Sequence, residues 1–301
     1  MNINNKINKI VKYPQIKLTE LQLKLLNAKP IFDIELSSRC NISCQFCPRD
    51  QLSKNNQGMM TKTTIRKVVS WLPSGATVML SGLGEPLLNK NLTYLVEGLR
   101  KKNIRITLYT NGLLATPNRI KTLIQKGLNE IQISLPALDI KKYTMLMPGS
   151  DLKTVLSNIK YLSKNMANRV SLRLNMIVDR MNKGETAKLL ELANTFNYRM
   201  SIRRIHSRAG HVRTERTIPE LYACGVLASV HFISWDGKIM SCVNDIARKK
   251  NLGMIFEKSF QKILEKKKTI ITQNKWFEYC TKCNDDSRYL ILFHGGVDFD
   301  C

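Results

Sequence analysis

Short apolar runs alternate with longer amphipathic stretches from Ile31 to about Ile205. The short runs predict six strands, at Phe32–Leu36, Thr77–Leu80, Ile104–Tyr109, Glu130–Ser134, Ser171–Val178 and Arg199–Ile205. The longer stretches predict five helices, near Thr61–Leu72, Asn91–Lys101, Pro117–Lys126, Leu152–Lys164 and Lys183–Phe196. Strands that alternate with helices are typical of parallel βα units, and right-handed crossovers curl such units into a barrel. We therefore predict an α/β fold with a partial barrel.

The pattern changes after Gly210. Two short apolar runs, Val230–Ser234 and Lys238–Ser241, flank a turn at Gly237 and predict a β-hairpin. A helix near Ser259–Lys266 and a loop with two cysteines follow. We predict a small α+β domain here, which divides the chain into an N-terminal extension (1–30), the barrel (31–210) and a C-terminal domain (211–301).

The composition is that of a folded protein. Of 301 residues, 43% are hydrophobic, so a buried core is expected and general disorder is not. No apolar run is long enough for a transmembrane helix or a signal peptide, so we expect a cytoplasmic protein without a membrane partner. The net charge of +25 fits an anionic partner, or a proteome rich in Lys and Asn. The basic residues are dispersed, and both interpretations stay open.

Eight cysteines carry the strongest chemical signal. Three of them, Cys40, Cys44 and Cys47, follow the first strand directly with the spacing C-x3-C-x2-C. Cysteines grouped in a cytosolic chain indicate metal binding or catalysis. Three thiolates leave one iron of a cubane cluster open, and that iron could chelate the amine and carboxylate of an amino acid. A structural zinc site would need a fourth ligand, and no further Cys or His lies close in sequence.

This cysteine loop, with Phe46 before its last cysteine, resembles the signature of the radical S-adenosylmethionine (radical SAM) superfamily. The resemblance extends from about Phe32 to Ile205. It implies a partial (β/α)6 TIM-like barrel and reductive cleavage of S-adenosylmethionine to a 5′-deoxyadenosyl radical. An electron donor such as flavodoxin or ferredoxin is then an expected partner.

Further positions agree with the resemblance. The segment Ser81-Gly82-Leu83-Gly84-Glu85-Pro86 is similar to the family's Gly-Gly-Glu-Pro segment, with Leu83 in place of a glycine. The resemblance implies that this backbone and Glu85 hold the methionine amino group. Asn111 and Ser134 lie at the ends of predicted strands, where the active sites of barrels form, and Asn175 lies within the fifth predicted strand. By resemblance, Ser134 and Asn175 could contact the ribose or carboxylate of the cofactor, and ordinary strand capping is the alternative.

A second group of cysteines lies in the last quarter of the chain, at Cys224, Cys242, Cys280 and Cys283. The predicted hairpin would return Cys242 toward Cys224, and four thiolates could fully ligate a second cluster. The pattern resembles the SPASM/twitch extension of radical SAM enzymes, which implies one auxiliary [4Fe-4S] cluster. The alternative is a four-cysteine zinc ribbon. The further cysteines of a full SPASM pattern are missing, apart from Cys301.

Three more residues are candidates for catalysis. Cys301 is unassigned, and could be inert, a distal cluster ligand, or a donor of a hydrogen atom to a substrate radical. Arg203 and Arg204 end the sixth predicted strand, where they could bind a phosphate or a carboxylate. A solvated basic face is the alternative.

An auxiliary cluster suggests that an electron leaves the substrate after hydrogen abstraction. We therefore expect oxidation or epimerisation of a small hydroxylated or amino-sugar-like metabolite, since twitch-bearing aminocyclitol dehydrogenases are similar in cysteine pattern. The alternative is a maturase of a ribosomally made peptide, whose acidic leader would meet the basic surface. Only about thirty residues precede the barrel, which is few for a leader-binding domain. A non-catalytic cluster protein that binds nucleic acid is a third hypothesis, against which an open iron argues.

Overall fold

Six parallel strands form the centre of the computed structural model, which describes residues 3–218, 220 and 223–295. They lie in the order β6-β5-β4-β3-β2-β1. Among the described strands β6 pairs only with β5, so the barrel is open. The bounds are β1 Ile31–Glu35, β2 Thr77–Ser81, β3 Arg105–Thr110, β4 Glu130–Ser134, β5 Ser171–Val178 and β6 Arg199–Arg204.

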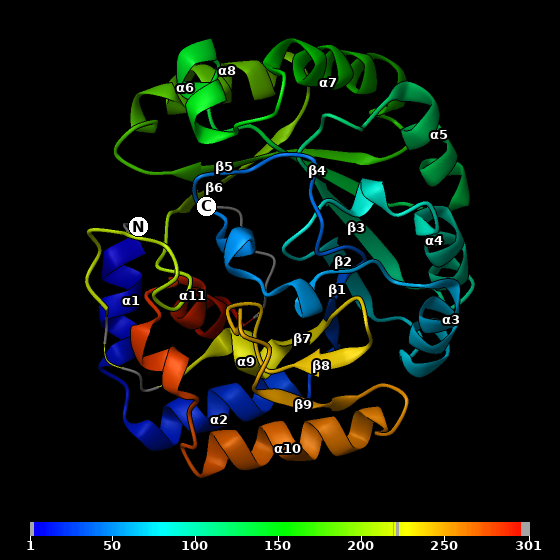
Figure 1. Cartoon of the computed structure of the whole chain (residues 1–301). Helices are drawn as coiled ribbons and strands as arrows, with labels where there is room; N and C mark the ends of the chain where they lie inside the picture. Colours follow the sequence, from blue (N-terminus) through cyan, green and yellow to red (C-terminus); the bar gives the residue numbers. More distant parts are fainter. Residues whose placement is uncertain (1–2, 219, 221–222, 296–301) are drawn as a thin grey trace.

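Six helices cover the outer face of this curved sheet (Figure 1). Thr61, Asp139 and Asp151 cap three of them by accepting hydrogen bonds from first-turn amides. The helices are α3 Lys62–Trp71, α4 Leu92–Arg100, α5 Pro117–Lys126, α6 Ile140–Leu146, α7 Leu152–Met166 and α8 Thr186–Thr195. Short 3₁₀ helices lie at η1 Pro48–Gln51, η2 Lys54–Asn56, η3 Pro86–Leu88 and η4 Lys183–Glu185.

Side chains alternate across each strand of the barrel. Outward residues such as Val78, Leu80 and Ile106 are fully buried under the helices and form the main core. Inward residues of the same strands, such as Thr77 and Thr107, are polar and line a cavity. The hydrophobic core therefore lies between sheet and helices, and most of the residues that line the inside of the barrel are polar.

The C-terminal part continues the same sheet. β7 pairs with β1 in parallel, from Ile31 opposite Val230 to Ile34 opposite Ile233, and β8 and β9 follow antiparallel. The sheet therefore has nine strands among the described residues. The remaining elements are α9 Gly225–Ser229, β7 Val230–Ile233, β8 Lys238–Met240, β9 Asn251–Met254, α10 Phe260–Thr272, η5 Glu278–Lys282 and α11 Ser287–His294.

Two N-terminal helices, α1 (Ile3–Val11) and α2 (Gln15–Leu26), pack against this C-terminal part. Ile10 and Leu18 share a second core with Ile271 from α10 and with residues of α11. The N-terminal extension is thus joined to the C-terminal part by side-chain packing, whereas the barrel is joined to the C-terminal part by the pairing of β1 with β7. The division at residues 30 and 210 stays a prediction.

The predicted α/β partial barrel is confirmed, and its six strands and five helices lie within a few residues of their expected positions. The hairpin is present as β7 and β8, and the helix expected near Ser259–Lys266 extends to Thr272. The sequence did not predict α1, α2, α6, α9, α11 or β9. Over the residues described, no helix combines the length and the apolar character needed to cross a membrane.

Candidate active site

The loop that carries the first three cysteines begins where β1 ends. Cys40, Cys44 and Cys47 are all half-buried and unpaired, without a disulfide among the described cysteines. The loop is tied to the segment after α6 by a main-chain hydrogen bond from Ser43 to Pro148 (2.9 Å). The loop therefore lies at the C-terminal edge of the parallel barrel, which is where active sites form in such folds.

These three thiols lie close enough to influence one another. Burial, together with the neighbouring thiols of Cys47 and Cys40, raises the pKa of Cys44 to about 12. Asn111, at the end of β3, directs its side-chain nitrogen to Cys40 Sγ (3.8 Å) and Asn41 Oδ1 (2.9 Å). A converging set of soft thiolate donors fits an iron–sulfur cluster, and a bound metal would offset the cost of deprotonation.

Gly84 holds the segment after β2 against the cysteine loop. A Cβ atom at this position would lie 2.2 Å from the carbonyl oxygen of Ser37 and 2.4 Å from that of Arg39. The next residue, Glu85, donates its main-chain N–H to Arg39 O (2.9 Å). Only glycine permits this approach, so the two segments predicted to bind the cofactor are packed together.

The Glu85 carboxylate is buried and already accepts three hydrogen bonds. They come from Leu87 N (3.0 Å), Thr110 Oγ1 (2.9 Å) and Asn111 N (2.8 Å). Burial raises the pKa of Glu85, and these donors oppose that rise. The carboxylate therefore links the ends of β2 and β3, and its remaining acceptor capacity is available to an ammonium group.

The other predicted cofactor residues are arranged as follows. Ser134 ends β4 and pairs in register with Asn175, which lies in the middle of β5, and both are half-buried. Ser81 donates to Asp33 Oδ1 (2.6 Å) inside the barrel. The Phe46 side chain is buried in the main core beside the loop. These residues thus lie at the same end of the barrel as the cysteine loop or in contact with its core.

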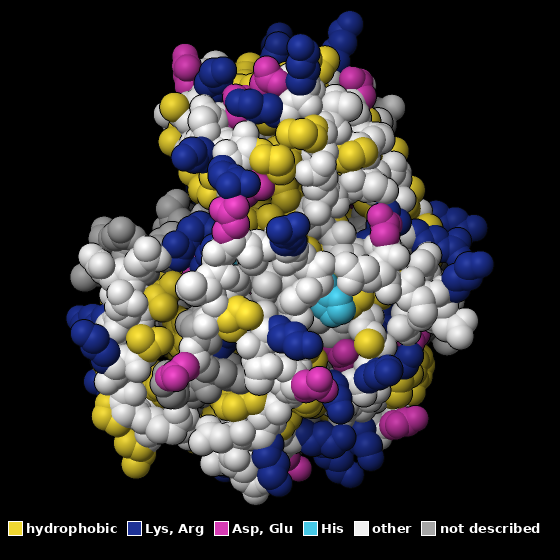
Figure 2. All heavy atoms as spheres, turned by 60° about the vertical axis from the view of Figure 1, so that its left-hand side comes forward, with side chains coloured by type: hydrophobic (Ala, Val, Ile, Leu, Met, Phe, Trp, Pro, Cys, Tyr) yellow, Lys and Arg dark blue, Asp and Glu magenta, His cyan; other side chains and the backbone are white. Residues whose placement is uncertain are grey.

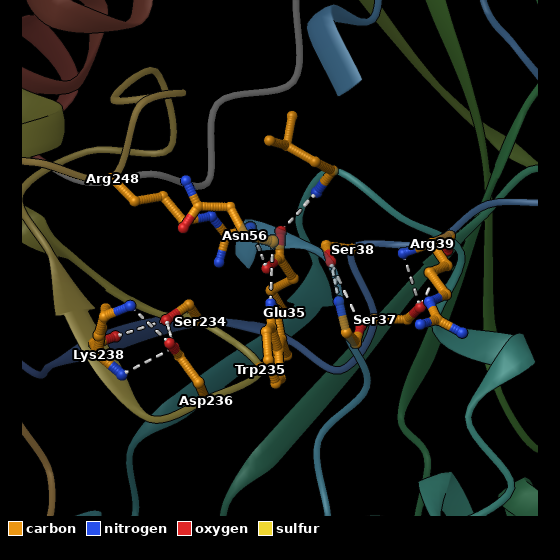
Figure 3. A network of polar contacts seen from close by, with 12 residues as sticks. Glu35, Ser37, Ser38, Arg39, Asn56, Ser234, Trp235, Asp236, Lys238 and Arg248 are labelled. Carbon is orange, nitrogen blue, oxygen red and sulfur yellow. Dashed lines mark hydrogen bonds and ion pairs between the residues drawn. The ribbon is translucent and has the colours of Figure 1, made fainter. Parts of the chain in front are cut away.

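An ion pair joins this end of the barrel to the C-terminal part (Figure 3). Arg248 donates to Glu35 Oε1 (2.6 Å), and both side chains are almost completely buried. The other carboxylate oxygen accepts from Leu83 N (3.1 Å), beside Gly82. Gly82 has φ +104, and a Cβ there would lie 2.7 Å from the Glu35 side chain. The segment next to Glu85 is therefore fixed from both halves of the chain.

The second group of cysteines surrounds a single small pocket. Cys224 precedes α9, Cys242 follows β8, and Cys280 and Cys283 lie in and after η5; all four line the pocket. Burial raises the pKa of Cys242, and the thiols of the other three raise it further. Within the described residues, no three Cys, His, Asp or Glu side chains are grouped as the ligands of one metal ion. In a cubane cluster each thiolate binds a different iron, so the four cysteines can lie farther apart than the ligands of a single metal ion do.

The inside of the barrel holds a cavity of about 310 Å³. Glu130, at the start of β4, lines this cavity. It accepts hydrogen bonds from three other lining residues, Arg105 (3.2 Å), Arg173 (3.1 Å) and Gln132 (2.8 Å), and from Arg199 beside the cavity (3.0 Å). One carboxylate among three guanidinium groups leaves this end of the cavity positively charged. The sequence predictions missed these residues, although the alternation of polar and apolar positions along the strands could have indicated them.

The two arginines that end β6 have different surroundings. Arg203 lines the cavity, and its side chain forms no hydrogen bond or ion pair with any residue that the structure describes. Arg204 points the other way and bonds Asp286 (2.8 Å) and Asn4 (2.8 Å). The third catalytic candidate, Cys301, lies outside the described residues. On the face drawn in Figure 2, other Lys and Arg side chains are scattered rather than gathered into one block.

Asp33, on β1, lies close enough to Arg203 for their charges to interact. Burial raises the pKa of Asp33 to about 7, while the hydrogen bond from Ser81 and the charges of Arg208 and Arg203 oppose the rise. A carboxyl group with such a pKa can accept or donate a proton near neutrality.

The fold and the cysteine loop define a class of protein. The sequence profile of the radical SAM superfamily matches residues 34–193, more than half of the chain. The chain therefore belongs to the radical SAM superfamily. A second profile, the SPASM iron–sulfur cluster-binding domain, matches residues 224–284, which include all four cysteines of the second pocket. The predicted cofactors, S-adenosylmethionine and two iron–sulfur clusters, are thereby supported in both parts of the chain.

Curated relatives match the barrel segment. An uncharacterised protein of Methanocaldococcus jannaschii is 32% identical over 161 residues, which are 52% of this chain and 53% of the relative. A probable GTP 3′,8-cyclase of the same organism is 31% identical over 130 residues, 42% of this chain and 43% of the relative. The chain thus aligns with about half the length of these relatives.

Solved structures share the whole fold at low sequence identity. BtrN in complex with AdoMet and 2-DOIA has a TM-score of 0.58 and 19% identity, covering 85% of this chain and 92% of that one. SuiB of Streptococcus suis, bound to the precursor peptide SuiA, has a TM-score of 0.67 and 15% identity, covering 91% and 74%. AdoMet-bound anSMEcpe has a TM-score of 0.62 and 15% identity, covering 90% and 92%.

Proposed function

We propose that this enzyme abstracts a hydrogen atom from a small, hydroxylated, anionic molecule held inside the barrel, and oxidises or epimerises it. The observation that carries the proposal is the cavity of about 310 Å³ with Arg203 and the arginines around Glu130 in and beside its walls. A cavity of this size suits a metabolite rather than a folded partner. Guanidinium groups suit a phosphate or a carboxylate.

The residues divide the work between cofactor and substrate. Cys40, Cys44 and Cys47 would hold the first cluster, and Glu85 would bind the methionine ammonium group. When bound, S-adenosylmethionine and this cluster supply the radical that removes a hydrogen atom. Asn111 would keep the cysteine loop in place through its bonds to Asn41 and Cys40.

Asp33 and the cavity residue Arg203 would handle the substrate after that step. An oxidised product requires the loss of one proton and one electron in addition to the hydrogen atom. Asp33 is the proton acceptor that its pKa of about 7 favours, and Arg203 would hold the anionic group opposite. The auxiliary cluster, held by the four cysteines of the second pocket, supplies an electron acceptor when bound.

The epimerising form of the reaction needs a hydrogen atom returned from the opposite face. Cys301 stays our candidate for that donor. In deuterated water the wild type should then place deuterium in the product, and Cys301→Ala should form 5′-deoxyadenosine without releasing the epimer. Unchanged product from Cys301→Ala would leave oxidation as the reaction.

A peptide maturase is the second candidate, favoured by the structural likeness to SuiB with its precursor peptide. One curated relative is named a probable GTP 3′,8-cyclase, so GTP, which is also anionic, is a further candidate substrate to test. The two classes differ in what the cavity must hold, because a metabolite would be enclosed and a peptide would enter from outside.

The test is a substrate panel with anaerobically reconstituted enzyme. The panel holds a sugar phosphate, an aminocyclitol, GTP and a peptide with an acidic leader, and product is followed by mass spectrometry. With the substrate found, Arg203→Met should raise KM by about tenfold or more, since a charge-assisted bond contributes about 1.5–3 kcal/mol. Arg213→Met, at an exposed position, is the control. Turnover of the peptide alone, or an unchanged KM in Arg203→Met, would contradict the proposal.

A further inference from the structure

One lysine of the run Lys266-Lys267-Lys268 is completely buried. Lys267 has no exposed surface, whereas both neighbours are exposed. On α10 it stands four residues after Ile263 and four before Ile271, which are also fully buried. Lys267 therefore occupies a core position on the apolar stripe of the helix, where an apolar residue is the rule.

The Lys267 ammonium group has little local compensation. It donates one hydrogen bond, to the carbonyl oxygen of Val230 (2.6 Å), and forms no ion pair with a carboxylate in the described part of the chain. Its titratable neighbour His231 is buried too, with a pKa far below the usual value because of burial and the Lys267 charge. An isolated buried ammonium group is strongly unfavourable, so Lys267 keeps its charge only where a negative charge lies close by, and otherwise loses its proton.

The second cysteine pocket lies close enough to Lys267 to supply such a charge. Val230, the hydrogen-bond acceptor of Lys267, begins β7 directly after α9, which Cys224 precedes. Val230 also packs in one cluster with Cys242. Burial lowers the pKa of Lys267 to about 7, while the charges of Cys242 and Cys224 oppose that fall. A cluster ligated by four thiolates is anionic, and more so when reduced.

We propose that Lys267 is the internal counter-charge of the auxiliary cluster and makes that cluster easier to reduce. A cation near a cluster favours the state with the extra electron, because burial and charge are the levers that set its potential. The residue does not contact substrate and acts through the cluster alone. The inference is independent of which substrate the barrel binds.

The first test measures the reduction potential. Wild type, Lys267→Met and Lys268→Met are reconstituted anaerobically, and the auxiliary cluster is titrated by electron paramagnetic resonance. The same titration in a Cys40, Cys44 and Cys47→Ala background isolates the auxiliary cluster. We expect Lys267→Met to disfavour reduction about tenfold, which is 59 mV for a one-electron couple, and Lys268→Met to match the wild type. An unchanged potential in loaded Lys267→Met would overturn the proposal.

The second test covers the case in which Lys267→Met fails to retain the cluster. Urea denaturation of the chain without clusters should show that Lys267→Met is at least as stable as the wild type, because an uncompensated buried charge has been replaced by an apolar side chain of similar length. If Lys267→Met loses the cluster while its cluster-free chain is as stable as the wild type, the result supports Lys267 as the counter-charge of the cluster. Loss of the cluster with lower stability of the cluster-free chain would overturn it, because Lys267 would then be a structural residue.

Discussion

Replacing Gly84 by Ala should detach the segment before Glu85 from the cysteine loop. The added Cβ would lie 2.2 Å from Ser37 O, which is 0.8 Å closer than the 3.0 Å below which Cβ atoms in proteins essentially never approach another heavy atom. Both close atoms are main-chain carbonyls, so no side-chain rotation relieves the contact. Forcing such a contact costs about 1–3 kcal/mol. If the loop moves to relieve it, the fraction of correctly assembled sites falls by about 5–150-fold.

The assay is 5′-deoxyadenosine formation by anaerobically reconstituted enzyme with excess dithionite. The rate with Gly84→Ala should fall by that factor, and the binding of S-adenosylmethionine, measured by calorimetry, should weaken in parallel. Gly184→Ala is the matched control, because a Cβ at that position meets nothing within 4 Å and φ is not positive. Equal rates for the two variants would refute the packing of Gly84 against the cysteine loop.

Three carboxylates give further predictions. Glu130→Gln should lower the free energy of unfolding by about 2–3 kcal/mol in urea denaturation, since a buried carboxylate among three guanidinium groups is lost; the exposed Glu97→Gln should cost less than about 1 kcal/mol. Glu85→Gln should weaken S-adenosylmethionine binding about ten- to a hundred-fold with iron content unchanged, because an amide attracts an ammonium group less than a carboxylate does; undisturbed binding in calorimetry would remove Glu85 from the cofactor site. Burial alone would raise the pKa of Glu185, but two main-chain amides and Lys142 outweigh it and hold that pKa at about 2. The stabilisation by the ionised Glu185 is therefore present above pH 4.5 and lost as the pH falls toward 2. In Glu185→Gln, the free energy of unfolding of the cluster-free chain should depend less on pH over that interval; the same pH dependence as in the wild type would argue against these bonds.

Local patterns were sufficient for the barrel and for the loop of the first three cysteines. Strands such as Ser171–Val178 have one face under helices, so their apolar residues recur at every second position, and the spacing of Cys40, Cys44 and Cys47 is set by one loop. The pairing of β7 with β1 was not predictable, because no local feature of Val230–Ile233 selects a partner about 200 residues away. Lys267 was missed for another reason. In a run of three lysines its charge hides the spacing that places it between Ile263 and Ile271.

That long-range pairing has a consequence for how the chain is made. β1 pairs with β2 soon after both leave the ribosome, but its other edge waits for β7. Synthesis of the roughly 200 intervening residues takes about 10–40 s at 5–20 residues per second. During that time the nascent barrel presents an unpaired parallel edge beside the loop of Cys40, and such edges pair readily with other chains. A polypeptide truncated before Val230 would keep this edge of β1 unpaired permanently. We therefore expect the last quarter of the chain to protect the first strand from aggregation.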